Sequence, residues 1–125
     1  MPDYPLVLFT GSRDWPNFSR VGYEMARLRS VIGNYRPVHG GARGVDTFVQ
    51  VTAHRDGYPE PIVDWPDYTR WGRYAAPKAR NTTMLQRSPM LVMAFWWEGS
   101  RTGGTLDCID KAVNTFRIPL ILCRR

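Results

Sequence analysis

The chain has 125 residues, which is the length of one domain with a single hydrophobic core. Its hydrophobic share of 43% and charged share of 22% are ordinary for a soluble globular protein. No apolar run approaches the roughly 18 to 20 residues that a membrane span needs, which argues against a membrane protein. The start of the chain lacks a signal-peptide pattern, and two scattered cysteines, Cys108 and Cys123, indicate reduced thiols. We therefore expect a cytoplasmic protein.

The formal net charge is +6, and the basic residues are spread along the chain. A dispersed charge is more typical of a soluble surface than of a nucleic-acid-binding stripe. It is also compatible with small anionic ligands, which need local rather than global charge.

Short apolar runs alternate with amphipathic stretches along the chain. The predicted strands are residues 5–10, 36–39, 61–64, 90–97 and 118–123. The predicted helices are residues 19–33, 44–56, 77–87 and 103–116. The third helix is expected to begin at Pro77, because proline favours the first helical position. The aromatic segment 65–76 before it is expected to be irregular.

Strands that alternate with helices predict an α/β protein with a parallel sheet. We expect a single Rossmann-like, doubly wound domain whose five-stranded parallel sheet has the order 3-2-1-4-5, with helices on both faces. In this order the chain reverses direction between the first and fourth strands. Ligands of such folds bind outside the carboxyl ends of the strands at this switch point.

Three glycine-rich turns each follow a predicted strand, at residues 10–15, 39–46 and 98–105. Each turn combines glycine with an arginine. Glycine lets the backbone approach a ligand closely, and the first amides of the following helix can receive an anion. Arginine adds a planar donor fork suited to phosphate. The turns therefore predict a phosphate-binding rim. The candidate ligand-binding residues are Gly11, Ser12, Arg13, Gly40, Gly41, Ala42, Arg43, Gly44, Asp46, Arg80, Gly103, Gly104 and Thr105.

Structural roles compete with several of these assignments. Arg43 could bind a phosphate or pair with Asp46, and Asp46 could favour the helix dipole or hold a ribose hydroxyl. Ser12 could grip a phosphate or cap backbone amides. Thr105 could be a simple cap.

Other residue types give weaker signals. Trp15, Trp65 and Trp71 could each stack a base. His39 is expected to be a structural hydrogen-bonding residue. Without Cys/His ligand spacing we expect no metal site, and we assign no cofactor and no catalytic residue. The phosphate loop of P-loop NTPases is also absent.

Four motifs occur in order along nearly the whole chain: residues 10–15, 39–46, 80–84 and 103–105. In these motifs the chain resembles the DUF2493 group of the SLOG superfamily, Rossmann-like proteins related to YspA and YpsA. The resemblance implies binding of a nucleotide or nucleotide-derived molecule, sometimes as a sensor in stress or conflict systems. Relatives often form dimers through helices of the core, so the resemblance also allows a homodimer.

Enzyme relatives, the LOG-type phosphoribohydrolases, release the base from a nucleoside 5′-monophosphate. They use an Arg-x-x-x-Met element, which Arg80 and Met84 match, and a Pro-Gly-Gly-x-Gly-Thr-x-x-Glu element. The chain departs from the second element, because Cys108 stands where the catalytic glutamate belongs. The neighbouring Asp107 would point about 100° away on a helix. This departure argues against the hydrolysis.

The first hypothesis is thus a nucleotide-binding module or sensor. The second is an N-glycosidic hydrolase of nucleoside monophosphates, with Asp107 or Asp14 in place of the glutamate. The third, less favoured, is single-stranded nucleic-acid binding, which the high isoelectric point and the SLOG-like protein DprA suggest.

Overall fold

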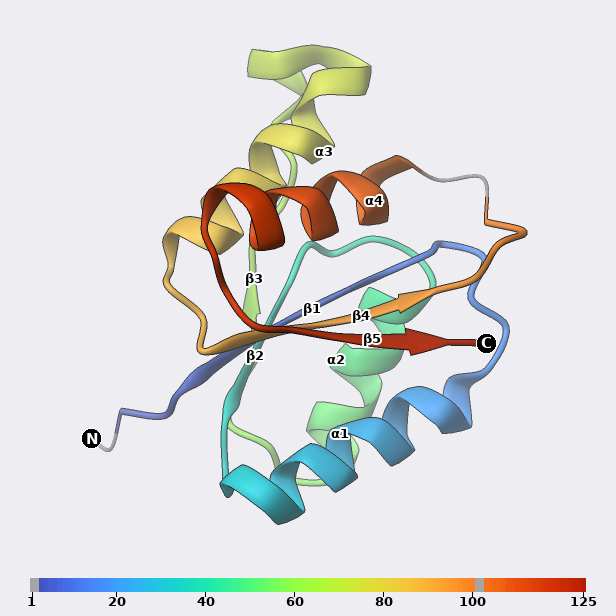
Figure 1. Ribbon diagram of the computed structural model, residues 1–125, viewed down its shortest axis with the longest axis vertical. Coiled ribbons are helices and arrows are strands. Elements are labelled where there is room, and N and C mark those ends of the chain that lie inside the picture. Colours follow the sequence, from blue (N-terminus) through green and yellow to red (C-terminus); the bar gives the residue numbers. More distant parts are fainter. Residues whose placement is uncertain (1–2, 101–102) are drawn as a thin grey trace.

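The computed structural model describes residues 3–100 and 103–125. The predicted fold is confirmed: the domain is α/β, with a five-stranded, all-parallel sheet in the order β3-β2-β1-β4-β5 (Figure 1). The strands are β1 (Leu6–Gly11), β2 (Arg36–His39), β3 (Ile62–Val63), β4 (Leu91–Trp96) and β5 (Leu120–Arg124). The helices are α1 (Phe18–Ile32), α2 (Val45–Arg55), α3 (Tyr68–Gln86) and α4 (Gly103–Asp110), and a π-helical turn, Lys111–Thr115, continues α4.

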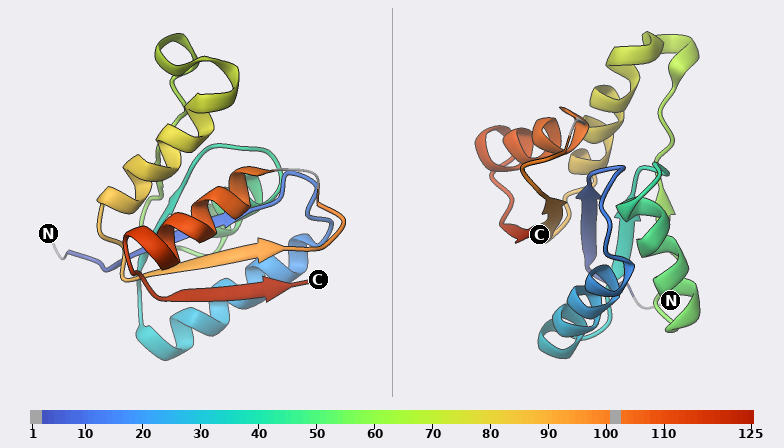
Figure 2. Two further views of the ribbon diagram at one scale, coloured as in Figure 1. Left: turned by 45° about the horizontal axis from the view of Figure 1, so that its top comes forward. Right: turned by 90° about the vertical axis from the view of Figure 1, so that its right-hand side faces the viewer.

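Helices cover both faces of the sheet (Figure 2). Alternate residues of a strand point to opposite faces, so Val7 and Phe9 of β1 face one way and Leu8 the other. Val7 and Phe9 belong to a buried cluster with residues of α1 and α2. Leu8 belongs to a second buried cluster with residues of α3 and α4. Because both faces are buried, β1 and β4 are continuously apolar, as a central parallel strand requires.

Helix α3 differs from the prediction. Asp67 caps it by accepting a hydrogen bond from the Arg70 amide at 3.0 Å, so the helix begins at Tyr68. Residues 65–67 are irregular as predicted, whereas residues 68–76 are helical except at Gly72. The break falls at Gly72, whose φ of 80° and ψ of 178° are not helical. Pro77 is inside the helix, and its missing N–H removes one hydrogen bond there. The first turns of α3 project beyond the rest of the domain (Figure 1).

All five strands run in the same direction, so their carboxyl ends meet at one edge of the sheet. The connections β1–α1, β2–α2 and β4–α4 leave from this edge. They contain the three glycine-rich turns of the sequence. Arg101 and Thr102 of the third turn lie outside the described residues. Within residues 3–100 and 103–125, no helix is long and apolar enough to cross a membrane.

Candidate functional site

A cavity of about 340 Å³ lies at the carboxyl end of β1, between the first two glycine-rich turns, α3 and the start of α4. Most of the predicted ligand-binding residues line it: Gly11, Arg13, Ala42, Asp46, Arg80, Gly103, Gly104 and Thr105. The topology thus brings together residues up to 95 positions apart in the chain (10 to 105), because the strands that carry them are neighbours in the sheet. Ser12, Gly40, Gly41, Arg43 and Gly44 are not among the lining residues.

The backbone amides of the second turn are already occupied. Asp46 Oδ2 accepts hydrogen bonds from the amides of Gly40 and Ala42, both at 3.1 Å. The Gly41 amide donates to Nδ1 of His39 at 3.1 Å. The predicted phosphate cradle is therefore filled by the chain's own carboxylate and imidazole, and these three amides are not free for a ligand in this conformation.

The glycines of this turn serve close packing. A Cβ on Gly40 would collide with the guanidinium of Arg80, and one on Gly41 would collide with the ring of Trp65. Gly44 has a φ of 76°, and a Cβ there would lie 2.6 Å from the carbonyl oxygens of Ser12 and Arg13. The second turn thus packs directly on the first turn, on α3 and on Trp65, and the contact of Gly44 with the backbone of the first turn requires a glycine.

His39 has the structural role that the sequence predicted. It is buried, and its Nε2 lies 2.6 Å from Gln50 Oε1. Because Nδ1 accepts the Gly41 amide, the imidazole hydrogen is on Nε2 and is donated to Gln50. The ring connects the end of β2 to α2 and leaves no nitrogen for acid–base chemistry in the cavity.

Asp46 is a buried carboxylate on the cavity wall. Burial raises the pKa of Asp46 above its ordinary value, while the two amide donors and Arg80 act in the opposite direction. The turn amides therefore hold a group whose charge is costly to bury. No ion pair forms between Arg43 and Asp46, because Oδ2 accepts the two amides and Arg43 is exposed on the turn.

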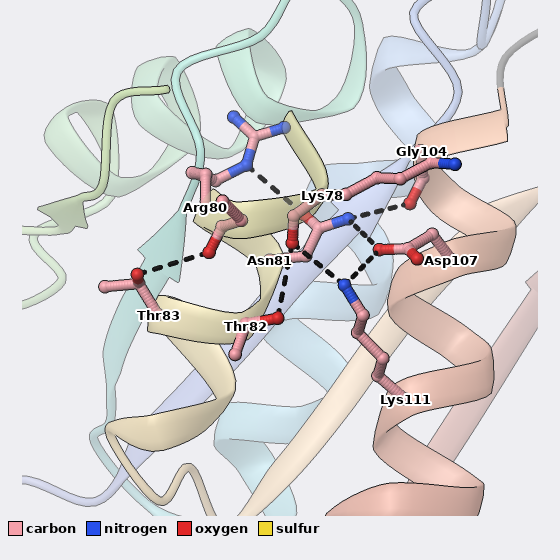
Figure 3. Close-up of polar contacts among 9 residues, drawn as sticks. Lys78, Arg80, Asn81, Thr82, Thr83, Gly104, Asp107 and Lys111 are labelled. Atoms are coloured by element: carbon pink, nitrogen blue, oxygen red, sulfur yellow. Dashed lines mark hydrogen bonds and ion pairs between the residues drawn. The ribbon is translucent and has the colours of Figure 1, made fainter. Parts of the chain in front are cut away.

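Arg80 and Asn81 connect α3 to the two neighbouring turns, and Figure 3 shows the contacts of Asn81 with Gly104 and Asp107. Arg80 Nη1 donates to the carbonyl of Gly40, and Nε donates to Asn81 Oδ1 at 3.2 Å. Asn81 Nδ2 donates to the carbonyl of Gly104 at 3.0 Å and to Asp107 Oδ2 at 3.1 Å. Asn81 is buried, so these bonds fix the start of α4 against α3.

The cavity is rich in cations. Arg13, Arg73, Lys78 and Arg80 line it, and three of them are exposed while Arg80 is half-buried. The start of α4 adds the positive end of its dipole, since the first amides of an α-helix have no partner within the helix. The lining residues thus offer several hydrogen-bond donors to an anion, and they include one carboxylate, Asp46.

Neither of the carboxylates proposed for hydrolysis lines the cavity. Asp107 is held by Asn81 and by an ion pair of 3.0 Å with Lys111 Nζ, and it does not line the cavity. Asp14 Oδ1 accepts a hydrogen bond from Trp97 Nε1 at 3.3 Å, also away from the cavity. Burial raises the pKa of the Cys108 thiol to about 12, so Cys108 is neutral and is no substitute for a glutamate.

Two further predictions are decided by burial. Trp15 is only 3% exposed and packs edge-on against Phe95, so it belongs to the core and stacks no base. Ser12 is fully buried, its amide donates to the Phe95 carbonyl, and its Oγ has no hydrogen-bond partner within the described residues. Ser12 caps no helix, since α1 is capped by Asn17.

Seven lining residues were not predicted as ligand-binding: Thr10, Arg73, Tyr74, Pro77, Lys78, Asn81 and Met84. Asn81 stands next to Arg80 in a motif that was identified, and that proximity was the available signal. Arg73 and Tyr74 fall in the segment expected to be irregular, so their common face with Arg80 was not foreseen.

Within residues 3–100 and 103–125, no group of three or more His, Cys, Asp or Glu side chains could hold a metal ion. Both cysteines are free and buried. Comparison with protein-family models, curated proteins and solved structures found no match. The resemblance to the SLOG superfamily therefore stays a proposal.

Proposed function

We propose that the chain is a nucleotide-binding module of the SLOG type, which binds a nucleotide or nucleotide-derived ligand in the 340 Å³ cavity, as a sensor rather than an enzyme. The observation that carries the proposal is the meeting of the α4 N-terminus with four cationic side chains at the carboxyl edge of the sheet. A helix N-terminus and arginine forks are the groups that proteins use for phosphate.

The orientation of the ligand follows from which donors are free. The amides of Gly40, Gly41 and Ala42 are engaged by Asp46 and His39, so the phosphate belongs on the opposite wall, at Gly103–Thr105. There Arg13 and Lys78 can reach it. Tyr74, which is exposed and lines the same cavity, offers a ring face to the base.

Binding without turnover is the better supported alternative. Glycosidic cleavage needs a carboxylate near the reacting carbon. Asp46 is the lining carboxylate among the described residues, and its Oδ2 is engaged by two amides. Hydrolase activity would be detected as base release by chromatography, and loss of the release in Asp107→Asn would support that second hypothesis.

The test is isothermal titration with nucleosides and their 5′-monophosphates. We expect the monophosphates to bind and the matching nucleosides to bind far more weakly. Arg13→Ala and Lys78→Ala should each weaken binding about 10- to 150-fold, which corresponds to the loss of one hydrogen bond to a charged group. Arg43→Ala is the matched control, because this exposed arginine lies in the second turn but does not line the cavity. Equal affinities for nucleoside and nucleotide would contradict the proposal.

A further inference from the structure

A second cleft of about 520 Å³ lies beside the cavity, along the neighbouring face of α3. Lys78 and Arg80 line both the cavity and the cleft, so the two share a cationic border. The cleft also contains two tryptophans, Trp65 and Trp71. We propose, building on the nucleotide-binding function above, that this cleft takes a second nucleobase joined through a phosphate to the nucleotide in the cavity.

The two tryptophans are exposed although large aromatic side chains are usually buried. Trp65 is 70% exposed, and its ring packs against Gly41, in the space that a Cβ there would fill. Trp71 is 48% exposed, and the guanidinium of Arg70 lies 4.9 Å from its ring centroid. An exposed indole offers a face on which a nucleobase can stack. The two tryptophans thus supply stacking surfaces within the cleft.

The charge of the cleft favours an anionic occupant. Arg70, Lys78, Arg80 and Lys111 line it, against one carboxylate, Asp67, which caps α3. Lys111 is paired with Asp107 and donates to the Lys78 carbonyl at 2.9 Å (Figure 3), so the cations of Arg70 and Lys78 dominate. Aromatic rings interleaved with cations are how proteins bind linked nucleotides without reading their sequence. The interface core of a protein dimer is instead depleted of lysine, of which this cleft has two, Lys78 and Lys111.

The shared border explains how one ligand would occupy both spaces. The phosphate that joins two nucleotides would lie at Lys78 and Arg80, with one base on each side of α3. This linked-nucleotide chemistry is common to a free dinucleotide and to the 5′ end of a single strand. Either source would place its second base against Trp65 or Trp71.

The experiment compares each of the four 5′-mononucleotides with the corresponding 5′-phosphorylated dinucleotide by isothermal titration. We expect the dinucleotide to bind about 5- to 150-fold more tightly, since one stacked base contributes this factor. Trp71→Ala and Trp65→Ala should remove the gain and leave mononucleotide affinity unchanged. Tyr23→Ala is the control, an aromatic residue of α1 that is 62% exposed on the other face of the sheet.

The outcomes separate the two proposals. If neither class of ligand binds the wild type, the nucleotide-binding function fails. If mononucleotides bind but dinucleotides bind no more tightly, or the gain survives in both tryptophan variants, only the second-base proposal is overturned. The same holds if sedimentation shows a dimer that Trp71→Ala dissociates, because the cleft is then a protein interface.

A 5′-phosphorylated 12-mer distinguishes the two sources. Tighter binding than the dinucleotide, with an affinity that falls steeply with salt, identifies a strand end. Equal affinity identifies a free dinucleotide.

Discussion

Asp46 holds the second glycine-rich turn in place, and its removal tests that role. Its Oδ2 is the acceptor for the amides of Gly40 and Ala42. In Asp46→Ala both amides lose their partner, whereas Asp46→Asn keeps a carbonyl oxygen in the same position. The two variants share the loss of charge, so the difference between them isolates the acceptor.

The magnitude follows from the burial of the two bonds. An unsatisfied buried amide costs about 1 to 3 kcal/mol. The bond to Gly40 is buried, while the bond to Ala42 is partly buried, so water can replace the second more easily. We therefore expect Asp46→Ala to be about 2 to 4 kcal/mol less stable than Asp46→Asn.

The assay is urea unfolding at pH 7 for the wild type and both variants. Asp56→Ala is the control, because Asp56 is an exposed carboxylate whose ion pair with Arg55 lies on the surface, so its removal should change stability little. If Asp46→Ala and Asp46→Asn unfold at the same urea concentration with the same slope, Asp46 does not hold the turn. The amides of Gly40 and Ala42 would then be available to a phosphate, as the sequence suggested.

Three further predictions concern the same region and the core. Because burial raises the pKa of Asp46, its contribution to stability is full below its unfolded pKa and is lost as pH rises through the folded pKa. The stability of Asp46→Asn relative to wild type should therefore rise as the pH increases above the ordinary pKa of an aspartate, and a constant difference in urea unfolding would contradict this. Gly44→Ala should be more destabilising than Gly57→Ala. Both glycines have a positive φ, which costs an alanine about 1 to 2 kcal/mol, but only a Cβ at Gly44 would also meet the carbonyls of Ser12 and Arg13. Equal urea midpoints of unfolding for the two variants would refute the packing of the two turns. Cys108 and Cys123 are buried, and burial raises the pKa of each thiol to about 12, so a thiol reagent should label them only on the time scale of unfolding. Rapid labelling of the native protein would contradict this, because it would show that a thiol is accessible.

The sheet order could be predicted because its signals are local. Continuous apolar runs such as residues 91–95 mark buried parallel strands, and the alternation with helices restricts the topology. The meeting of the turns at one edge follows from that order, which is why residues as distant as Arg13 and Gly104 were predicted to lie together.

The availability of the turn amides could not be predicted in the same way. A glycine-rich turn before a helix has the same sequence whether its amides face a ligand or an internal carboxylate. From the sequence, Asp46 could favour the helix dipole or hold a ribose hydroxyl. In the structure its side-chain rotamer instead directs Oδ2 to the amides of Gly40 and Ala42, from which it accepts hydrogen bonds. The start of α3 was missed for a related reason, because the Asp67 cap and the break at Gly72 outweigh the preference of Pro77 for a first turn.

The position of the phosphate is the central claim, and amide chemical shifts test it most directly. The probe is the 5′-mononucleotide with the highest affinity in the titration, added to ¹⁵N-labelled protein, with its nucleoside as the reference. We predict that the phosphate-dependent shifts centre on Gly103, Gly104 and Thr105 at the start of α4, and that the amides of Gly40 and Ala42 stay on Asp46 and move little. Phosphate-dependent shifts centred on Gly40, Gly41 and Ala42 instead would contradict the account and return the phosphate to the second turn.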